Sequence, residues 1–554
     1  MKRMVALLAT AALAAPLAAL AAEGPAVPES SIARPPAAAR PAAALDEPAG
    51  PPAYAPRLAR NTPPDLAAEV PPGPVTQFGD ALERAYWTSP ALIAQRARLR
   101  STDYRLPQAR ALSGPSLSYR ATYGYQRDNI ESPFGSWFAQ SGWSSTAAAI
   151  LTQPLLTFGR NAAGERGALA EIAFERAQLR SSEANALFGA IRAYVLLLRA
   201  GDALSIVEED LALLEREYAD NTARFAKREV TSSDLQQVET RVELSRAQLF
   251  SARDELATAR AQFLAAVGAP AGDLAPPDPL PVPVRTLEEV YAFAESHSPV
   301  LGGAYARERI SRAAADAARA AMLPRVDLRG TGEIGTVSPY SDSRRATALR
   351  GEVVVSGLIF DSGLLRARLQ EAEAANDADW RLIDQALREN RAEVADAWNE
   401  WLAQTAAIDR LRLASDAARR AFEGALLQEK AGLRTTLDVL SLARELLQAR
   451  SAYTTATASA YLAQARLLAA MGALERSYLT PDAPPGDDPD RHLRQTRSSG
   501  EVPLLVPALR AVDRLFVGGR KNRPVRDPAG PLTTDGVPLP VPASGGVEVP
   551  AQPD

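Results

Sequence analysis

The sequence predicts a mainly helical protein with a smaller β part, in which one structural unit occurs twice. Three observations support this fold class. The chain is rich in Ala, Leu and Arg and has only 6% aromatic residues, which is typical of long packed helices. Two long stretches, 160–227 and 364–430, contain no proline. Ahead of each lie short segments in which apolar and polar residues alternate, as they do in β-strands.

Composition excludes several classes of function. The 554 residues include no Cys, which rules out disulfides, cysteine nucleophiles and thiolate metal sites. The two histidines, His297 and His492, are too few for a histidine metal cage. The net charge of −4 provides no basic field for nucleic acid. Because phosphate-loop, zinc-protease and hydrolase motifs are also absent, we expect no enzyme activity, no cofactor and no bound metal.

The first residues indicate export. Lys2 and Arg3 precede an apolar run that ends near Leu20, and small residues follow, as they do at a secretory cleavage site. We therefore expect residues 1–21 to be a signal peptide. With no Cys at the cleavage point, the mature chain is not expected to be lipidated. No later stretch approaches the roughly 18 uninterrupted apolar residues of a membrane-spanning helix.

Proline marks the expected boundaries. Most of the 43 prolines lie in residues 22–75, which are Pro/Ala-rich, and in residues 481–554. Such segments bury too little apolar surface to offset chain entropy, so both are expected to be largely disordered. Within the tail, residues 502–517 have the pattern of a short helix, to which no role is assigned. Another proline cluster, at 270–284, is expected to link two halves, which span 76–269 and 285–480.

The two halves repeat one another. The Ser-Pro pairs that begin at Ser89 and Ser298 are 209 residues apart, whereas Gly159 and Gly363 are 204 residues apart. The later Thr-x-x-Asp motifs keep the separation of 204. A constant separation on either side of one five-residue change indicates a duplication with one loop of unequal length.

Each half is expected to open with a helix. Ser89 and Ser298 are suitable N-caps, because a proline follows each at the first helical position. These helices are expected to run to about Arg110 and Met322. Two strands follow in each half, with approximate bounds of 116–128, 143–156, 325–335 and 345–360.

The expected strands have one apolar and one polar face. Alternation over about ten residues fits strands with lipid on one side and water on the other. The residues expected to face lipid are Leu117, Tyr119, Tyr123, Val326 and Leu328.

The proline-free stretches predict two helices of about 100 Å each, at 1.5 Å per residue. Each is followed by a short break and a second helix of roughly 55 Å. Thr231 with Asp234, and Thr435 with Asp438, have the Thr-x-x-acid spacing of a capping box at the start of that second helix. Two shorter helices stacked end to end match one long helix in length, which suggests a layer of near-parallel columns.

Four strands are too few to close a membrane barrel, since the smallest examples have about eight. An open sheet edge in lipid leaves backbone groups unpaired, at several kcal/mol each. Two alternatives follow: several copies share one sheet, or the protein is a water-soluble helical bundle with two small hairpins. The tyrosine-rich alternating face favours the shared sheet.

These features resemble the TolC-like outer-membrane channel family. The resemblance rests on TQPLLTFG at 152–159, KAGLRTTLDVL at 430–440, and the duplicated order of helix, hairpin, long helix and helix. It covers about residues 76–479. It implies a homotrimer in which four strands per chain form one 12-stranded outer-membrane β-barrel, continued by a periplasmic α-barrel of antiparallel helices. It also implies a periplasmic adaptor and an inner-membrane pump of the RND or ABC type.

The resemblance assigns roles to the two helix–helix breaks. Asp438 matches the family's pore constriction, where a ring of carboxylates favours cations. Arg434 matches a position that ties the closed entrance to a neighbouring helix. Asp234 is the counterpart of Asp438 in the first half, and capping alone would account for it. The turns expected to contact an adaptor are Lys227, Arg228, Glu229 and Val230, and Ala431, Gly432 and Leu433.

One turn departs from the family pattern. The family usually has Gly where this chain has Arg228. Gly adopts the left-handed backbone conformation of a tight turn without strain, whereas Arg does so only at a cost. Gly432 keeps the usual residue in the second half.

We therefore expect an exit duct in the outer membrane that extends into the periplasm. It would passively conduct small toxic molecules or secreted polypeptides delivered by an inner-membrane pump. The alternative is an extended periplasmic coiled-coil adaptor or scaffold without a pore of its own. An adaptor has one helical hairpin between β-rich modules, so duplication of the whole unit favours the duct.

Overall fold

The computed structural model describes residues 73–282, 284–480, 486, 488–496 and 505–516. The expected signal peptide and most of the segment 22–75 lie outside these residues. The elements of the first half are α2 (Phe78–Thr88), α3 (Pro90–Asp103), α4 (Arg105–Ala111), β1 (Ser116–Glu131), β2 (Trp137–Leu156), α5 (Arg160–Ala226) and α6 (Ser232–Val267). Those of the second half are α7 (Leu287–His297), α8 (Pro299–Ala320), β3 (Arg325–Ser338), β4 (Ser341–Ser356), α9 (Leu364–Lys430) and α10 (Thr436–Met471). Three short helices follow, α11 (Arg476–Leu479), α12 (Pro489–Thr496) and α13 (Leu505–Arg514).

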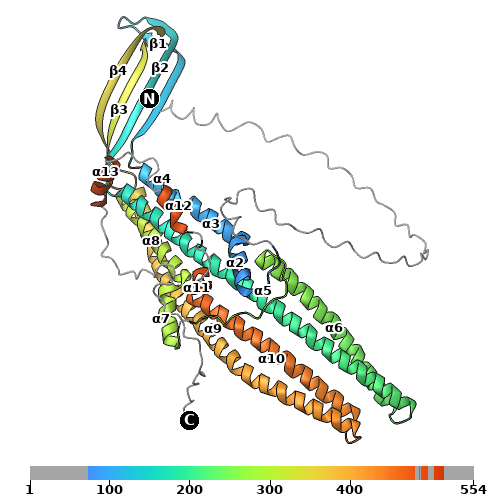
Figure 1. Ribbon diagram of the computed structural model, residues 1–554. Coiled ribbons are helices and arrows are strands. Elements are labelled where there is room, and N and C mark those ends of the chain that lie inside the picture. The colour runs from blue at the N-terminus through green and yellow to red at the C-terminus, as the bar shows by residue number, and fades with distance from the viewer. Residues whose placement is uncertain (1–72, 283, 481–485, 487, 497–504, 517–554) are drawn as a thin grey trace, which may run out of the picture. The chain divides into compact units, whose positions relative to one another are not determined.

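The long helices confirm the predicted fold class. α5 and α9 each have 67 residues, and α6 and α10 each have 36. The absence of proline lets the backbone hydrogen bonds of α5 and α9 continue without interruption. Figure 1 shows these helices running alongside one another, with the sheet at the end where α5 and α9 begin. α8 packs between α5 and α9 and so joins the two repeats.

The first predicted helix is divided, which differs from the continuous helix expected up to about Arg110. α3 ends at Asp103 and α4 starts at Arg105. Pro107 is the physical reason, because it has no N–H to bond the carbonyl of Asp103 and its ring would clash with that carbonyl. The second half has no proline at the corresponding position, and α8 continues to Ala320.

The four strands form one antiparallel sheet in the order β1-β2-β3-β4. The hairpin strands are longer than predicted, since β2 begins at Trp137 rather than 143 and β4 begins at Ser341 rather than 345. The strands are longer because backbone pairing between β1 and β2 continues as far as Glu131 opposite Trp137. The residues in this outer part of the hairpin have the composition of a loop, so their sequence does not indicate a strand. β4 ends at Ser356 rather than 360. The position that would pair beyond Ser356 is occupied by Pro324, which cannot donate to the ladder.

The register puts apolar side chains on one face of the sheet. Tyr119 pairs with Ala149, Ala149 with Gly332, and Gly332 with Leu349, so these four residues form one row across all four strands. Directly paired residues point to the same face. The ends of this row are almost fully exposed, with Tyr119 at 89% and Leu349 at 91%. The next row, Arg120-Ala148-Glu333-Ala348, lies on the opposite face and carries charge.

The predicted lipid-facing residues share this apolar face. Leu117 pairs with Leu151, and Leu328 pairs with Val353, on the side of the sheet that carries Tyr119. Tyr123 stacks on Trp143 with 5.0 Å between ring centroids. Val326 pairs with Val355 and is half-buried.

The main apolar core lies in the helices. It joins the middle of α5 and α9 to the later parts of α6 and α10 and to the short helices α2 and α7. Tyr194, Phe263, Leu468 and Met471 are among its fully buried side chains. None of the helices within the described part of the chain combines the length and the apolar character that crossing a membrane requires.

Two short helices, α12 and α13, lie in the described part of the tail, and α13 falls within the short helix predicted at 502–517; most of segment 481–554 lies outside the described residues. α12 packs on α3, where His492 Nδ1 lies 2.8 Å from Asp103 Oδ2. α13 packs on α5 and β2. The composition of the tail concealed these contacts because they depend on partners several hundred residues earlier.

Candidate functional site

The two turns between long and short helices form the candidate site. They lie at the ends of the helix pairs farthest from the sheet (Figure 1). In the first turn, Glu229 N–H donates to Arg224 O at 3.0 Å and Arg228 N–H donates to Phe225 O at 2.9 Å. In the second, Leu433 N–H donates to Gln428 O at 2.8 Å, and Gly432 N–H donates to Glu429 O at 2.8 Å. Both pairs of bonds define a Schellman motif, which satisfies the last carbonyls of a helix.

Arg228 adopts the left-handed conformation that its counterpart Gly432 adopts. The φ angles are 65° at Arg228 and 71° at Gly432. The first turn therefore has the tight geometry of the second without the usual glycine. The hydrogen bonds of the Schellman motif hold Arg228 in a conformation that costs a non-glycine residue about 1–2 kcal/mol.

We expect Arg228→Gly to stabilise the end of α5. Relief of the left-handed strain exceeds the extra entropy that Gly loses on folding, so the net gain should be about 0.5–1 kcal/mol. Amide exchange at Lys227 and Glu229, compared between variant and wild type, measures this gain. Faster exchange at these amides in the variant would contradict the assignment of strain.

Both acidic residues of the site cap helices. Thr231 Oγ1 donates to Asp234 Oδ2 at 2.7 Å, and Thr435 Oγ1 donates to Asp438 Oδ2 at 2.8 Å. Each Asp backbone N–H donates to the threonine hydroxyl, and each threonine backbone N–H donates to the Asp carboxylate, which together form a capping box in both halves. The hydrogen bonds from Thr231 lower the pKa of Asp234 and keep it ionised. Asp438 is exposed at the start of α10.

The residues predicted to contact an adaptor are mostly exposed. Lys227, Arg228 and Glu229 are exposed, and Val230 is half-buried. Leu433 is 77% exposed. Two other leucines close to the same turn, Leu427 and Leu437, are exposed as well. Arg434 is exposed as well, and within the described residues it makes no hydrogen bond or ion pair.

A buried polar cluster links the two turns and was missed by sequence reasoning. Arg224 Nη1 donates to Glu429 Oε1 at 3.2 Å. Thr436 Oγ1 donates to the same Glu429 oxygen at 2.9 Å and lies 3.3 Å from Asn221 Oδ1. Burial, with the charge of Glu429 second, raises the pKa of Glu217. The sequence does contain a signal for this cluster. Three polar residues, at 217, 221 and 224, lie on one face of a helix that is otherwise expected to pack through apolar residues.

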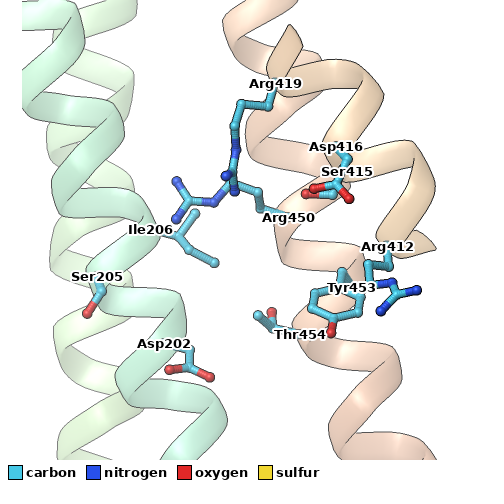
Figure 2. A pocket seen from close by; sticks show the side chains of 10 residues that line it. All are labelled: Asp202, Ser205, Ile206, Arg412, Ser415, Asp416, Arg419, Arg450, Tyr453 and Thr454. Carbon is cyan, nitrogen blue, oxygen red and sulfur yellow. The ribbon is translucent and has the colours of Figure 1, made fainter. Parts of the chain in front are cut away.

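A crevice of about 310 Å³ lies farther along the same helices, between α5 on one side and α9 and α10 on the other (Figure 2). Figure 2 shows Arg419 and Arg450 extending toward Ile206 of α5. Arg450 Nη1 donates to Glu209 Oε2 at 2.6 Å and so bridges α10 to α5. Burial raises the pKa of Asp202 at the crevice wall. The residues that line the crevice are Asp202, Ser205, Ile206, Arg412, Ser415, Asp416, Arg419, Arg450, Tyr453 and Thr454.

Within the described residues, no group of three or more His, Asp or Glu side chains is arranged to hold a metal ion. The candidate site offers exposed turns, helix-capping carboxylates and polar links between helices. Such groups suit contacts with ions and with other proteins.

Comparison with known proteins identifies relatives of the chain. The family model described as "Outer membrane efflux protein" matches residues 81–269 and 290–473. Outer membrane efflux protein BepC of Brucella suis is 25% identical over 403 residues, which cover 72% of this chain and 86% of BepC. Protein CyaE of Bordetella pertussis is 28% identical over 419 residues, which cover 73% of this chain and 86% of CyaE.

Solved structures share the fold. The outer membrane protein VceC of Vibrio cholerae has a TM-score of 0.62 at 20% identity, over 71% of this chain and 96% of VceC. The CmeC outer membrane channel of Campylobacter jejuni has a TM-score of 0.64 at 14% identity, over 76% of this chain and 89% of CmeC. The two matched stretches of the family model together span more than half of the chain, one in each repeat. The chain belongs to the outer membrane efflux protein family, and its fold is that of the TolC-like channels.

Proposed function

We propose that this chain is the passive outer-membrane exit duct of a tripartite efflux or type I secretion system. The observation that carries the proposal is the sheet, which has a continuous exposed apolar face, an opposite charged face and two outer edge strands. Water on both sides would make the row from Tyr119 to Leu349 unfavourable, whereas lipid on one side makes it favourable.

The sheet edges support assembly from several copies. β1 pairs only with β2, and β4 only with β3, among the described strands. In lipid, the outer backbone groups of β1 and β4 need partners. Pairing β4 of one copy with β1 of the next supplies them, and three copies give twelve strands, which exceeds the roughly eight that a closed sheet needs. We therefore propose a homotrimer.

The helices and turns support a periplasmic extension. Helices of 67 residues reach about 100 Å from the strands to the turns. We propose that the turns Lys227–Val230 and Ala431–Leu433 contact a periplasmic adaptor, and that an inner-membrane pump of the RND or ABC type supplies the energy. An export signal at residues 1–21 and the absence of a lipid anchor belong to the same proposal. BepC and AprF, named as efflux and alkaline protease secretion proteins, are consistent with either cargo class.

The test uses single-cysteine labelling, for which a chain without Cys is suited. Tyr119→Cys and Arg120→Cys place thiols on opposite faces of β1. In intact outer membranes, we expect a lipid-soluble quencher to reach a fluorophore at position 119 but not one at position 120. The purified protein should form ion-conducting channels in planar bilayers. A monomer in detergent that gives no conductance, with equal access of a water-soluble reagent at both positions, would refute the duct and favour the periplasmic scaffold.

We expect Asp438→Asn to reduce the cation selectivity of that channel. Three copies of Asp438 around one axis form a ring of negative charge, and loss of three nearby charges should lower the cation-to-anion permeability ratio by roughly threefold at low salt. Reversal potentials in a salt gradient measure this ratio. Asp234→Asn is the matched control, because it removes the equivalent charge from the other turn. An equal loss of selectivity in both variants would contradict the assignment of the constriction to Asp438.

A further inference from the structure

The C-terminal helix α13 packs on the joint where β2 leads into α5. Figure 1 shows it at the end of the sheet from which the long helices start. Val506 is buried at 1% exposure, and the ring of Phe516 meets the ring of Phe158 edge-on with 5.2 Å between centroids. α13 lies beyond residue 473, where the family match ends, so the duplicated unit does not account for it.

Asp513 of α13 caps the start of α5. Its Oδ1 accepts hydrogen bonds from Thr157 N–H at 3.0 Å, Thr157 Oγ1 at 2.9 Å and Gly159 N–H at 3.0 Å. Its Oδ2 accepts from Ala162 N–H at 3.2 Å. The first N–H groups of a helix have no partner within the helix, and a carboxylate there also interacts favourably with the helix dipole. Asp513 is buried, so these bonds form away from water.

The second repeat caps the corresponding helix with a local residue. Asp361 occupies the position that Thr157 occupies in the first repeat, 204 residues earlier. Asp361 accepts from Gly363 N–H at 3.0 Å and from Leu365 N–H at 2.8 Å.

The backbone at the two joints is nearly the same. φ is 51° and 88° at Phe158 and Gly159, and 55° and 87° at Ser362 and Gly363. At both joints, backbone N–H groups at the start of the long helix donate to a carboxylate. The joints differ in where that carboxylate comes from in the chain.

A second charged contact also distinguishes the two joints. Glu165 of α5 is buried and accepts from Arg514 Nη2 at 2.8 Å and from Arg110 Nε at 2.9 Å. Burial raises the pKa of Glu165, but the hydrogen bonds from Arg514 and Arg110 outweigh it and the net shift is downward. In the second repeat the corresponding residue is Leu369, which needs no cation. Asp513 and Arg514 thus contact two positions that differ between the repeats.

In the first repeat, Thr157 Oγ1 accepts from Asn161 N–H at 3.2 Å, but no local side chain accepts from Gly159 N–H as Asp361 does from Gly363. We infer that α13 supplies the carboxylate cap that the first repeat lacks in its own sequence. Asp513 is a positioning residue that fixes the direction in which α5 leaves β2. The first strand-to-helix joint therefore depends on docking of the C-terminal segment, whereas the second joint is complete without it. The cap at the start of α5 can therefore form only after the chain has been synthesised as far as α13.

The test is a double-mutant cycle in the full-length protein. Asp513→Ala removes the distant cap, and Thr157→Asp restores the local cap that Asp361 provides in the second repeat. The readout is amide hydrogen exchange at Gly159, because Asp513 binds this N–H and Asp361 binds its counterpart Gly363. Exchange at Gly363 is the internal control in every variant.

We expect Asp513→Ala to speed exchange at Gly159 by about tenfold or more, with Gly363 unchanged. Thr157→Asp alone should lower stability, because two carboxylates then compete for one helix start. The double variant should return Gly159 to within about threefold of wild type. Folding of the double variant where Asp513→Ala alone fails to fold would also support the inference. Unchanged exchange in Asp513→Ala, no recovery in the double variant, or failure of both to fold would overturn it.

Discussion

Gly472→Ala is expected to destabilise the protein by about 2–5 kcal/mol. Gly472 ends α10 with φ of 77°, a conformation that costs a non-glycine residue about 1–2 kcal/mol. A Cβ at this position would lie 2.6 Å from the carbonyl oxygen of His297 and 2.9 Å from Cα of Ser298. These are backbone atoms at the α7–α8 break, and Ser298 is buried, so they cannot move without displacing both helices. Overpacking of this kind adds about 1–3 kcal/mol.

Two further glycines provide matched controls for that prediction. Gly268 ends α6 with φ of 78°, and its Cβ would meet side-chain atoms of Thr88 rather than backbone, the shortest contact being 2.6 Å to Oγ1, which can move only by giving up its hydrogen bonds to Arg84 O and Val267 O. Gly432 has φ of 71° and no atom within 4 Å of the added Cβ. Guanidinium unfolding, followed by helical circular dichroism, should rank the alanine variants at 472, 268 and 432 in decreasing order of destabilisation. Equal effects at Gly472 and Gly432 would show that backbone conformation alone, rather than the contact with α7, sets the cost.

Glu183→Gln is expected to stabilise the protein at pH 8 and to leave it nearly unchanged at pH 4.5. Burial raises the pKa of Glu183 from 4.5 to about 7, although the Arg476 N–H donates to its Oε1 at 2.8 Å, and the charge of Glu475 adds to the increase. The folded state therefore holds this proton over a range in which the unfolded chain has released it. Stability is lost as the pH rises from about 4.5 to about 7.

The size of the effect follows from the two pKa values. A folded value of about 7 against 4.5 corresponds to about 3 kcal/mol of lost stability above pH 7, which a neutral glutamine removes. Denaturant unfolding at pH 4.5 and pH 8 measures the difference. Glu239→Gln, on the exposed side of α6, is the control and should change stability by less than about 0.5 kcal/mol at either pH. A Glu183→Gln variant with the same stability change at both pH values would contradict the prediction.

The sequence predicted the helical framework well because its signals are local. Proline-free stretches of the right length gave α5 and α9 to within one residue, and the Thr-x-x-Asp spacing gave both capping boxes. The strand bounds were less accurate, since strand ends depend on cross-strand partners such as Glu131 with Trp137. Arg in place of the usual Gly at position 228 predicts a departure from the tight turn, yet the hydrogen bonds of the turn hold Arg228 in the left-handed conformation.

The candidate site was predicted only in part. The turns and their acidic residues followed from spacing and from the resemblance, whereas the cluster of Asn221, Arg224, Glu429 and Thr436 did not. Those side chains meet because α5 packs beside α10 and because Arg224 near its end reaches Glu429 at the end of α9, more than 200 residues later in the chain. No pattern within either turn specifies that neighbour.

By itself the sequence determined the duplication, the helix lengths, the alternating strands and the exclusion of cysteine chemistry, because each follows from residue type and spacing along the chain. Only the tertiary structure decided that Asp513 caps α5, that Glu183 lies half-buried near the charge of Glu475, and that Gly472 packs against the α7–α8 break. These contacts join residues far apart in the chain. Their energies depend on burial and on sub-ångström distances, which packing sets and local sequence does not record.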